Sequence, residues 1–271
     1  MDDNLSNEFL KTAVSAARLA GDIILKNLGQ LSKEDVQTKQ AFDFVTKVDR
    51  WSEAVIMQTI REKFPSHRFL TEETLKQEDT GGYRWIIDPL DGTTNYIHRY
   101  PIFSVSIALE YGGEIIIGVV FDPSRDELFH AAKGEGAFLN NRQINVSETE
   151  LPERSLIATG FPFRAKEMID LYLRAFKEVF QRVSDIRRAG SAAIDLAYVA
   201  AGRFEGFFEL KLSPWDIAAV SLLIIEAGGI ITDFGGGNDY LSTGNIVAGN
   251  KYIQPEILKK IKDVFRGTVE R

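Results

Sequence analysis

The sequence predicts a mixed fold of two halves, an α+β half followed by an α/β half. Over residues 1–150 the helical patterns come first and the strand patterns follow, an order typical of α+β domains. After a boundary at Glu148–Arg154, strand and helix patterns alternate over residues 151–271, as they do in α/β domains. At 271 residues, the chain is long enough for the two halves to form one compact unit.

The helices of the first half are predicted from apolar residues at helical spacing. This spacing covers residues 9–28 and 49–64, and each segment is followed by a glycine or a proline that ends it. Aspartate is a favoured capping residue, so Asp49 is predicted to cap the second helix. The polar segment between the helices, Ser32–Phe42, is predicted to be a loop or a mobile flap.

Short apolar runs predict the strands of the first half. Arg68–Thr71 is predicted to be a strand that carries the acidic pair Glu72-Glu73 at its end, and Lys76–Gly82 is predicted to be a polar loop. Alternating apolar residues then predict an antiparallel meander, whose first turn is a Gly-Gly pair. The meander comprises residues 103–111, 114–121, 127–131 and 136–139.

The second half alternates between strand and helix patterns. The predicted strands are residues 156–159, 204–209, 230–232 and 246–248. The predicted helices are residues 165–183, 190–202, 214–227 and 255–264. The segment 214–227 is apolar on all sides, which is typical of a helix in the protein interior, so we expect it to be buried.

The composition excludes several classes of protein. The chain has no cysteine, which excludes disulfides and thiolate zinc sites, and its three scattered histidines argue against a histidine-rich metal site. No apolar run is long enough to cross a bilayer and the acidic N-terminus lacks a signal-peptide pattern, so we expect a cytoplasmic protein with no membrane partner. The net charge of −7 does not indicate nucleic-acid binding, although bound cations can reverse the local sign of an acidic pocket.

The stretch Trp85–Tyr96 is the most informative in the chain. Three large apolar residues predict a buried strand, which Asp88-Pro89 is predicted to break. A turn and a short helix follow, with an aspartate or a threonine as the cap. Asp-Gly alone would indicate only a turn. Two carboxylates three residues apart, followed by the free N–H groups of a helix start, instead suit a divalent cation beside a phosphate.

Three more acidic positions are candidates for the same site. Glu72-Glu73 is a like-charged pair that favours a nearby cation, unless one side chain points to water. Asp216 lies in the first turn of the all-apolar helix, where it suits the helix dipole, but a buried carboxylate needs a partner. For Glu209, at the end of a predicted strand, a surface acid is the simplest interpretation. Carboxylates with few histidines and no cysteine select hard cations such as Mg²⁺ or Mn²⁺.

Two long motifs resemble the signatures of the inositol monophosphatase family. They are Asp88-Pro89-Leu90-Asp91-Gly92-Thr93-Thr94-Asn95 and Trp215-Asp216-Ile217-Ala218-Ala219, the second running on to Glu226-Ala227-Gly228-Gly229. Two further segments, Arg187–Ala193 and Gly244–Asn250, resemble the bacterial, SuhB-type branch. The resemblance covers essentially the whole chain. It implies the layered αβαβα sandwich of the inositol monophosphatase and fructose-1,6-bisphosphatase (sugar phosphatase) fold, and a lithium-inhibited homodimer.

The resemblance also implies a metal site. By motif position, Glu72, Asp88 and the carbonyl of Leu90 would hold a first Mg²⁺. Asp88, Asp91 and Asp216 would hold a second, so that Asp88 bridges the two. Glu72 would contact a third, weaker ion through water, so we expect two to three Mg²⁺ ions, with Mn²⁺ as an alternative.

The same resemblance implies which residues act in catalysis and which bind the substrate. Asp49, Thr93 and Glu72 would be catalytic, with Asp49 and Thr93 orienting and activating the attacking water. The implied substrate contacts are Asp91, Gly92, Thr93, Ala192, Glu209 and Asp216. Among them, Gly92 and Thr93 would offer N–H groups to the phosphate, while Glu209 and the Ala192 backbone would contact inositol hydroxyls.

The sequence therefore predicts an Mg²⁺-dependent phosphatase that hydrolyses inositol 1-phosphate, or a similar small polyol phosphate, with metal-activated water. A threonine hydroxyl is a poor nucleophile without an adjacent base, so we expect no covalent phosphoenzyme.

Two kinds of alternative function stay open. A fructose-1,6-bisphosphatase or a nucleotide 3′-phosphatase of the same fold would need extra basic residues, for which Arg187 and Arg188 are candidates, although subunit or surface contacts explain both. A regulatory protein that binds RNA or the transcription machinery belongs to a different class. A protein that acted only by such binding would not need all of Glu72, Asp88, Asp91 and Asp216, so we do not expect binding to be the only role.

Overall fold

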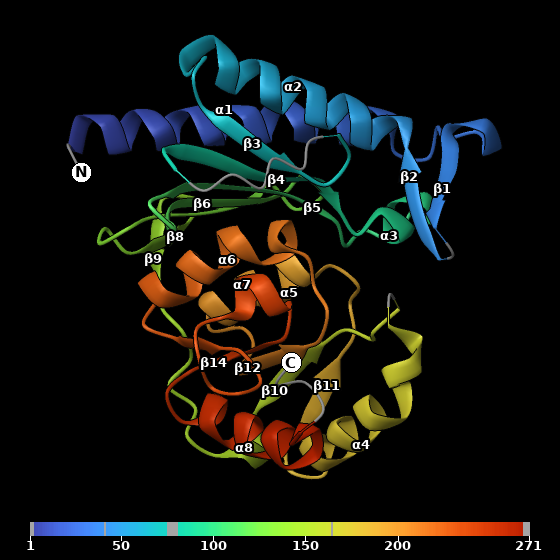
Figure 1. The fold of residues 1–271 in the computed structure, drawn as a ribbon, viewed down its shortest axis with the longest axis vertical. Coiled ribbons are helices and arrows are strands. Elements are labelled where there is room, and N and C mark those ends of the chain that lie inside the picture. Colours follow the sequence, from blue (N-terminus) through green and yellow to red (C-terminus); the bar gives the residue numbers. More distant parts are fainter. Residues whose placement is uncertain (1–2, 41, 75–80, 164, 268–271) are drawn as a thin grey trace.

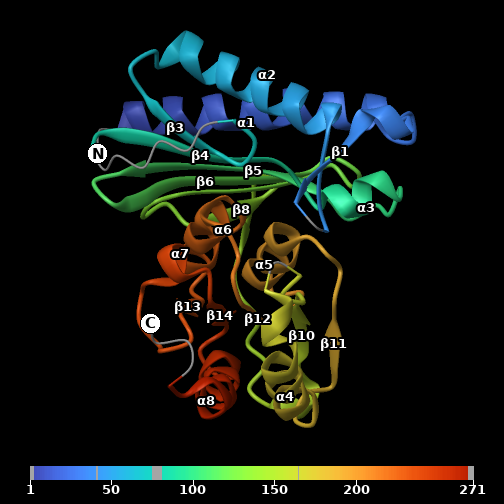
Figure 2. The same ribbon diagram turned by 45° about the vertical axis from the view of Figure 1, so that its right-hand side comes forward.

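Helices and sheets alternate in five layers (Figures 1 and 2). The computed structural model describes residues 3–40, 42–74, 81–163 and 165–267. Two long helices cover the outer face of a seven-stranded sheet, and a second helical layer separates this sheet from a five-stranded one. A third helical layer closes the far side. The αβαβα sandwich that the sequence predicts is therefore confirmed.

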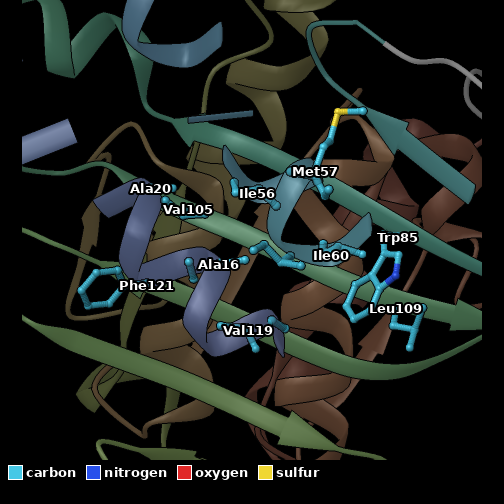
Figure 3. Packing of buried hydrophobic residues seen from close by; sticks show 14 of the residues in the cluster. Ala16, Ala20, Ile56, Met57, Ile60, Trp85, Val105, Leu109, Val119 and Phe121 are labelled. Carbon is cyan, nitrogen blue, oxygen red and sulfur yellow. The ribbon is translucent and has the colours of Figure 1, made fainter. Parts of the chain in front are cut away.

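The outer helical layer consists of α1 (Asp3–Asn27) and α2 (Lys47–Lys63). Their apolar faces pack on the sheet, because residues three and four apart share one side of a helix. Figure 3 shows this packing, in which apolar side chains of the two helices lie against apolar side chains of the sheet. The labelled members are Ala16, Ala20, Ile56, Met57, Ile60, Trp85, Val105, Leu109, Val119 and Phe121, all of them buried.

The seven-stranded sheet uses strands from the first half of the chain. Its order is β3 (Arg68–Thr71), β4 (Tyr83–Asp91), β5 (Ser104–Tyr111), β6 (Glu114–Asp122), β7 (Glu127–Ala132), β8 (Ala137–Leu139) and β9 (Arg142–Ile144). β3 and β4 are parallel, and every later pair is antiparallel. The predicted meander is confirmed. β9 was not predicted, because three residues with one apolar side chain give no pattern.

The second half contributes the other sheet and the helices on both of its faces. The strands are β10 (Leu156–Thr159), β11 (Asp185–Arg187), β12 (Gly206–Glu209), β13 (Ile230–Thr232) and β14 (Ile246–Gly249), in the order β11-β10-β12-β14-β13. The helices are α4 (Ile169–Phe180), α5 (Ala192–Ala200), α6 (Pro214–Glu226), α7 (Tyr240–Thr243) and α8 (Ile253–Phe265). α5 and α6 lie between the sheets, and α4 and α8 form the outermost layer.

The middle layer joins the two halves into one core. Buried residues of α5 and α6 form a single cluster with residues of both sheets. α6 approaches β6 so closely that a Cβ atom on Gly118 would lie 2.4 Å from the carbonyl oxygen of Ala219. α6 also packs with α5 and with strands of both sheets in this cluster, which explains why it is apolar on all sides, as the sequence indicates. The division into halves of residues 1–150 and 151–271 within one compact unit stays a prediction.

Two predictions about the segment that leads into α2 are wrong. The predicted flap Ser32–Phe42 contains a short 3₁₀ turn (Lys33–Asp35) and strand β1 (Val36–Gln40), which pairs antiparallel with β2 (Asp43–Thr46). This ribbon is held by backbone pairing and by polar side-chain contacts, such as that of Arg50 with Gln37, so it has no apolar pattern to reveal it. Asp49 is also not the cap of α2, as described below. Most of the predicted loop Lys76–Gly82 lies outside the described residues.

β4 does not stop at Asp88 as predicted. It continues through Pro89 to Asp91, and its pairing with β5 shifts register between the two aspartates. Proline is tolerated at such a bulge, because no ladder hydrogen bond is required of it there. Short helix α3 (Thr93–Ile97) follows, and Gly92 rather than an aspartate or threonine is its N-cap. A Cβ at Gly92 would lie 2.8 Å from a backbone oxygen and its φ is +88°, so both space and conformation require glycine.

None of the helices in the described ranges is long and apolar enough to span a membrane.

Candidate active site

Two aspartates of β4 and a third from a distant part of the sequence converge where β4 meets α6. Asp88 and Asp91 flank the bulge of β4, and Asp216 lies in the first turn of α6. One carboxylate oxygen from each of the three lies within 4.8 Å of the others. The structure thus brings together three of the predicted metal ligands.

Each of the three carboxylates is held in place by the backbone. Asp88 accepts the N–H of Leu90 at 2.9 Å, and Asp216 accepts the N–H of Ser213 at 2.7 Å in a capping box at the start of α6. Asp91 accepts the Ser191 hydroxyl at 2.5 Å and another backbone N–H, at 2.9 Å, from the start of α5. The acids therefore have fixed positions before any cation binds.

The electrostatics of the cluster favour a bound cation. Asp88 is 1% exposed, and its pKa is raised well above the ordinary value of an aspartate, first by burial and then by the charges of Glu72, Asp91 and Asp216. Buried like charges destabilise one another, and a hard divalent cation with oxygen ligands removes that cost. The donor set fits Mg²⁺ or Mn²⁺, whose preferred ligands are carboxylate oxygens.

Glu72 lies beside this cluster but is not one of the three convergent acids. Its N–H donates to the carbonyl of Ile87 at 3.2 Å, which extends the parallel pairing of β3 and β4 and places Glu72 level with Asp88. The ammonium of Lys39, from β1, contacts both Glu72 (2.9 Å) and Glu73. The cation that the like-charged pair was expected to need is therefore, in this structure, a lysine.

Asp49 and Thr93 form a hydrogen-bonded pair next to the cluster. The Thr93 hydroxyl lies 2.9 Å from Oδ1 of Asp49 and 3.0 Å from the carbonyl oxygen of Leu90, so it can donate its single proton to either. Burial raises the pKa of Asp49 to about 6, against the opposing hydrogen bonds from Thr46 and Thr93. The pair can therefore orient a hydrogen-bond donor such as water and accept a proton from it near neutral pH.

The cap of α2 explains how Asp49 is positioned. Thr46 is the N-cap, and its Oγ1 accepts the N–H groups of Val48 and Asp49. The other carboxylate oxygen of Asp49, Oδ2, accepts the N–H of Thr46 at 2.8 Å. This is a capping box, in which Asp49 stands three residues after the cap. One oxygen thus serves the helix start while the other faces Thr93.

A cavity of about 360 Å³ is lined by the three aspartates and Thr93, whereas Asp49 is not among the residues that line it. Its walls include every remaining predicted site residue: Glu72, Leu90, Gly92, Ala192 and Glu209. Ala192 is the first residue of α5, and Glu209 ends β12. Glu209 is only 6% exposed, so its interpretation as a surface acid is wrong. Burial, and secondly the charge of Asp216, raises the pKa of Glu209 well above the usual range.

The cavity wall includes one basic candidate from the sequence and further residues that were not predicted. Arg188, the candidate, lines the cavity, whereas Arg187 does not and pairs with Asp185 at 2.5 Å; both arginines are exposed. The two neighbouring arginines therefore have different surroundings, which no sequence pattern distinguishes. Gly160 and Asp195 also line the cavity. Asp195 sits in the first turn of α5, an arrangement that a dipole argument could have found.

Gly160→Ala is expected to destabilise the fold by about 1–3 kcal/mol, because overpacking at a filled site forces its neighbours to move. A Cβ at this position would lie 2.1–2.2 Å from the carboxyl group of Glu209. Denaturant unfolding of the single variant measures the cost. The double variant Gly160→Ala/Glu209→Ala is the matched control, since it removes the carboxyl group that the new Cβ would meet. If Gly160→Ala lowers the free energy of unfolding equally in the wild type and in Glu209→Ala, the contact is contradicted.

The layered αβαβα fold, with convergent carboxylates beside a cavity, places the chain in the structural class of the inositol monophosphatases and sugar phosphatases. The family model described as the inositol monophosphatase family matches residues 5–266, and the chain belongs to this family.

Individual relatives agree over nearly the full length. The chain is 48% identical over 263 residues to "Nus factor SuhB" of Escherichia coli (strain K12), with 97% of this chain and 98% of the relative covered. The crystal structure of suhB from Bartonella henselae superposes with a TM-score of 0.90 at 42% identity, covering 96% and 99% of the two chains. An inositol monophosphatase from Anabaena (Nostoc) sp. PCC 7120 gives 0.86 at 40%, covering 96% and 97%.

Proposed function

We propose that the protein is an Mg²⁺-dependent phosphate monoester hydrolase that converts inositol 1-phosphate to inositol and phosphate. The observation that carries the proposal is the convergence of Asp88, Asp91 and Asp216 beside the cavity. Acids this close are stable together when a divalent cation lies among them. Membership of the inositol monophosphatase family supports the same reaction.

The proposed ligands follow the motif positions. Glu72, Asp88 and the Leu90 carbonyl would hold one Mg²⁺, and Asp88, Asp91 and Asp216 a second, with a third near Glu72 and Mn²⁺ as a substitute. When bound, the cations lower the pKa of a coordinated water and neutralise charge on the phosphoryl oxygens. The rigid backbone contacts to the three aspartates support this assignment, because they fix the ligands in advance.

Asp49 and Thr93 are proposed to prepare the water for attack. If Thr93 donates its proton to Oδ1 of Asp49, the lone pairs of its Oγ1 are free to accept a hydrogen bond from water and hold it in line with the phosphorus. The proton then passes through Oγ1 to Asp49. Because both groups act on water, no bond forms between the protein and the phosphoryl group.

The cavity wall supports a small polyol monophosphate as the substrate. The buried carboxylate of Glu209 and the start of α5 at Ala192 are proposed to bind hydroxyl groups, and Gly92 and Thr93 to offer N–H groups to the phosphate. Among the described residues that line the cavity, Arg188 is the basic one. A second phosphate needs several positive charges, so this wall favours a monophosphate over fructose 1,6-bisphosphate or a nucleotide bisphosphate.

Phosphate release from inositol 1-phosphate, fructose 1,6-bisphosphate and adenosine 3′,5′-bisphosphate tests the proposal. We expect the first to be preferred, with release abolished by EDTA and reduced at least about 10³-fold in Asp91→Asn, because a ligand of the proposed metal is lost. The exposed Asp126→Asn is the control for a general loss of charge. Release that persists in Asp91→Asn would contradict the proposed site.

A second candidate function rests on the name of a relative. The Escherichia coli protein is called a Nus factor, a name that implies an association with the transcription machinery. If this chain acts in the same way, the folded Asp91→Asn variant should still bind its transcription partner although its phosphatase activity is lost. Salt-sensitive RNA binding by the purified protein, unchanged in Asp91→Asn, would support this role alongside the first.

The proposal includes a lithium-inhibited homodimer in the cytoplasm. The exposed side chains of Leu173 and Phe180, which lie two helical turns apart on one face of α4, support self-association through the outermost helical layer. The absence of cysteine is consistent with a reducing compartment.

A further inference from the structure

Glu53 is a buried acid that has no part in the proposed reaction. It lies on α2 four residues after Asp49, so the two carboxylates leave the same face of the helix one turn apart. Its side chain is almost completely buried, at 1% exposure. A buried carboxylate is costly unless it is hydrogen-bonded, so its partners indicate what it does.

Both oxygens of Glu53 bind the turn that follows β3. One accepts the backbone N–H of Glu73 at 2.9 Å, and the other accepts the hydroxyl of Thr74. On the other side of the turn, the N–H of Glu72 donates to the carbonyl of Ile87. Glu72 is thus fixed by the sheet through its own backbone and by α2 through the two residues after it.

This turn carries two adjacent acids. The ammonium of Lys39 contacts both carboxylates and offsets their mutual repulsion, but it does not hold the backbone of the turn. The backbone N–H of Glu73 and the hydroxyl of Thr74 are held instead by Glu53. Glu53 supplies that restraint from a helix whose first turn also carries Asp49.

We propose that Glu53 is a positioning residue, which holds Glu72 where it can ligate a cation. α2 then sets both the Asp49–Thr93 pair and the Glu72 turn from one rigid body, so that the water-orienting residues and the ligand keep a fixed separation. This inference rests on the proposed function, since it assumes that Glu72 binds a metal. Residues that orient a metal ligand typically change metal affinity 10- to 100-fold when they are lost.

The test compares two variants at this position. Glu53→Met keeps the volume but accepts no hydrogen bond, whereas Glu53→Gln can still accept the Glu73 N–H and bond to the Thr74 hydroxyl. Isothermal titration calorimetry with Mn²⁺ measures the metal affinity directly. The Mg²⁺ concentration that gives half-maximal phosphate release measures the apparent metal affinity during catalysis. We expect Glu53→Met to weaken both about 10-fold or more. Its kcat at saturating Mg²⁺ should stay within about 3-fold of the wild type, and Glu53→Gln should be near wild type in every readout.

A milder variant keeps the inference testable if Glu53→Met does not fold. Thr74→Val removes one contact from an exposed residue and should weaken Mn²⁺ binding roughly 3-fold, given the size of a single hydrogen bond. Wild-type Mn²⁺ affinity in folded Glu53→Met, or a loss of kcat with unchanged metal affinity, would overturn the inference. A wild type that binds Mn²⁺ but releases no phosphate would overturn the proposed function instead, and the calorimetric comparison would still decide the role of Glu53.

Discussion

Asp88→Asn is expected to reduce phosphate release at least about 10³-fold and, without Mg²⁺, to raise the melting temperature of the protein. Activity is lost because Asp88 is the proposed bridge between two cations. Stability rises because Asn keeps the shape and can still accept the N–H of Leu90, but removes a charge from among Glu72, Asp91 and Asp216.

The pH dependence of this effect has a definite sign. Burial raises the folded pKa of Asp88 above its unfolded value of about 3.9, so the folded state binds more protons than the unfolded state between the two values. The free energy of unfolding of the metal-free wild type should therefore fall as pH rises above about 4, and this slope should be smaller in Asp88→Asn. Mg²⁺ should stabilise the wild type at high pH, since it binds only the folded state.

Asp122→Asn is the matched control for the stability measurement. Asp122 is also fully buried, but it pairs with Arg125 at 2.8 Å and lies outside the cavity wall. Its loss leaves that pair broken, so this variant should melt at a lower temperature than the wild type. Melting temperatures that change in the same direction for both variants would contradict the electrostatic account of the cluster.

Asp49→Asn is expected to lower kcat by about 10²–10⁴-fold while leaving the Mg²⁺ dependence near wild type. Asn can still accept the N–H of Thr46 and keep the helix start, but it cannot take a proton through Thr93. A base must be deprotonated, and the pKa of Asp49 is about 6 without metal. Bound cations lower that value, so activity of the wild type should fall at or below about pH 6, and this acidic limb should be absent in the variant.

Thr46→Ala separates the cap from the catalytic role. It removes the N-cap of α2 and should cost about 1 kcal/mol of stability, with kcat affected far less than in Asp49→Asn. Comparable losses of kcat in the two variants would mean that Asp49 matters through the helix start alone. The pH profile distinguishes the two roles independently, because the reaction rate would not depend on the protonation of Asp49 if this residue only capped the helix.

The sequence was sufficient to predict the structure wherever the pattern that indicates it lies in neighbouring residues. The apolar run before Asp88 predicts a buried strand that ends in two carboxylates, and the all-apolar helix after Asp216 predicts its own burial, so all three convergent acids could be proposed from their neighbours alone. α1, α2 and the meander were predicted for the same reason. The spacing of apolar residues along the chain follows from the geometry of a helix or a strand with one buried face.

Local signals also misled at several positions. Asp49 reads as a cap by residue type, but Thr46 takes that position because its hydroxyl reaches the N–H groups of the first turn. Pro89 reads as the end of a strand, but a register shift lets β4 continue past it. In both cases the competing arrangement satisfies backbone hydrogen bonds that a single-residue rule does not count.

The sequence by itself determined the layered fold class, the acidic character of the site and, through its family motifs, the residues expected to hold a cation. Only the tertiary structure decided that Glu209 is buried, that Lys39 contacts Glu72, and that Arg188 but not Arg187 faces the cavity. The physical reason is distance along the chain. Burial and charge pairing at these positions are set by elements tens of residues away, which pack there only once both sheets and the helices between them have assembled.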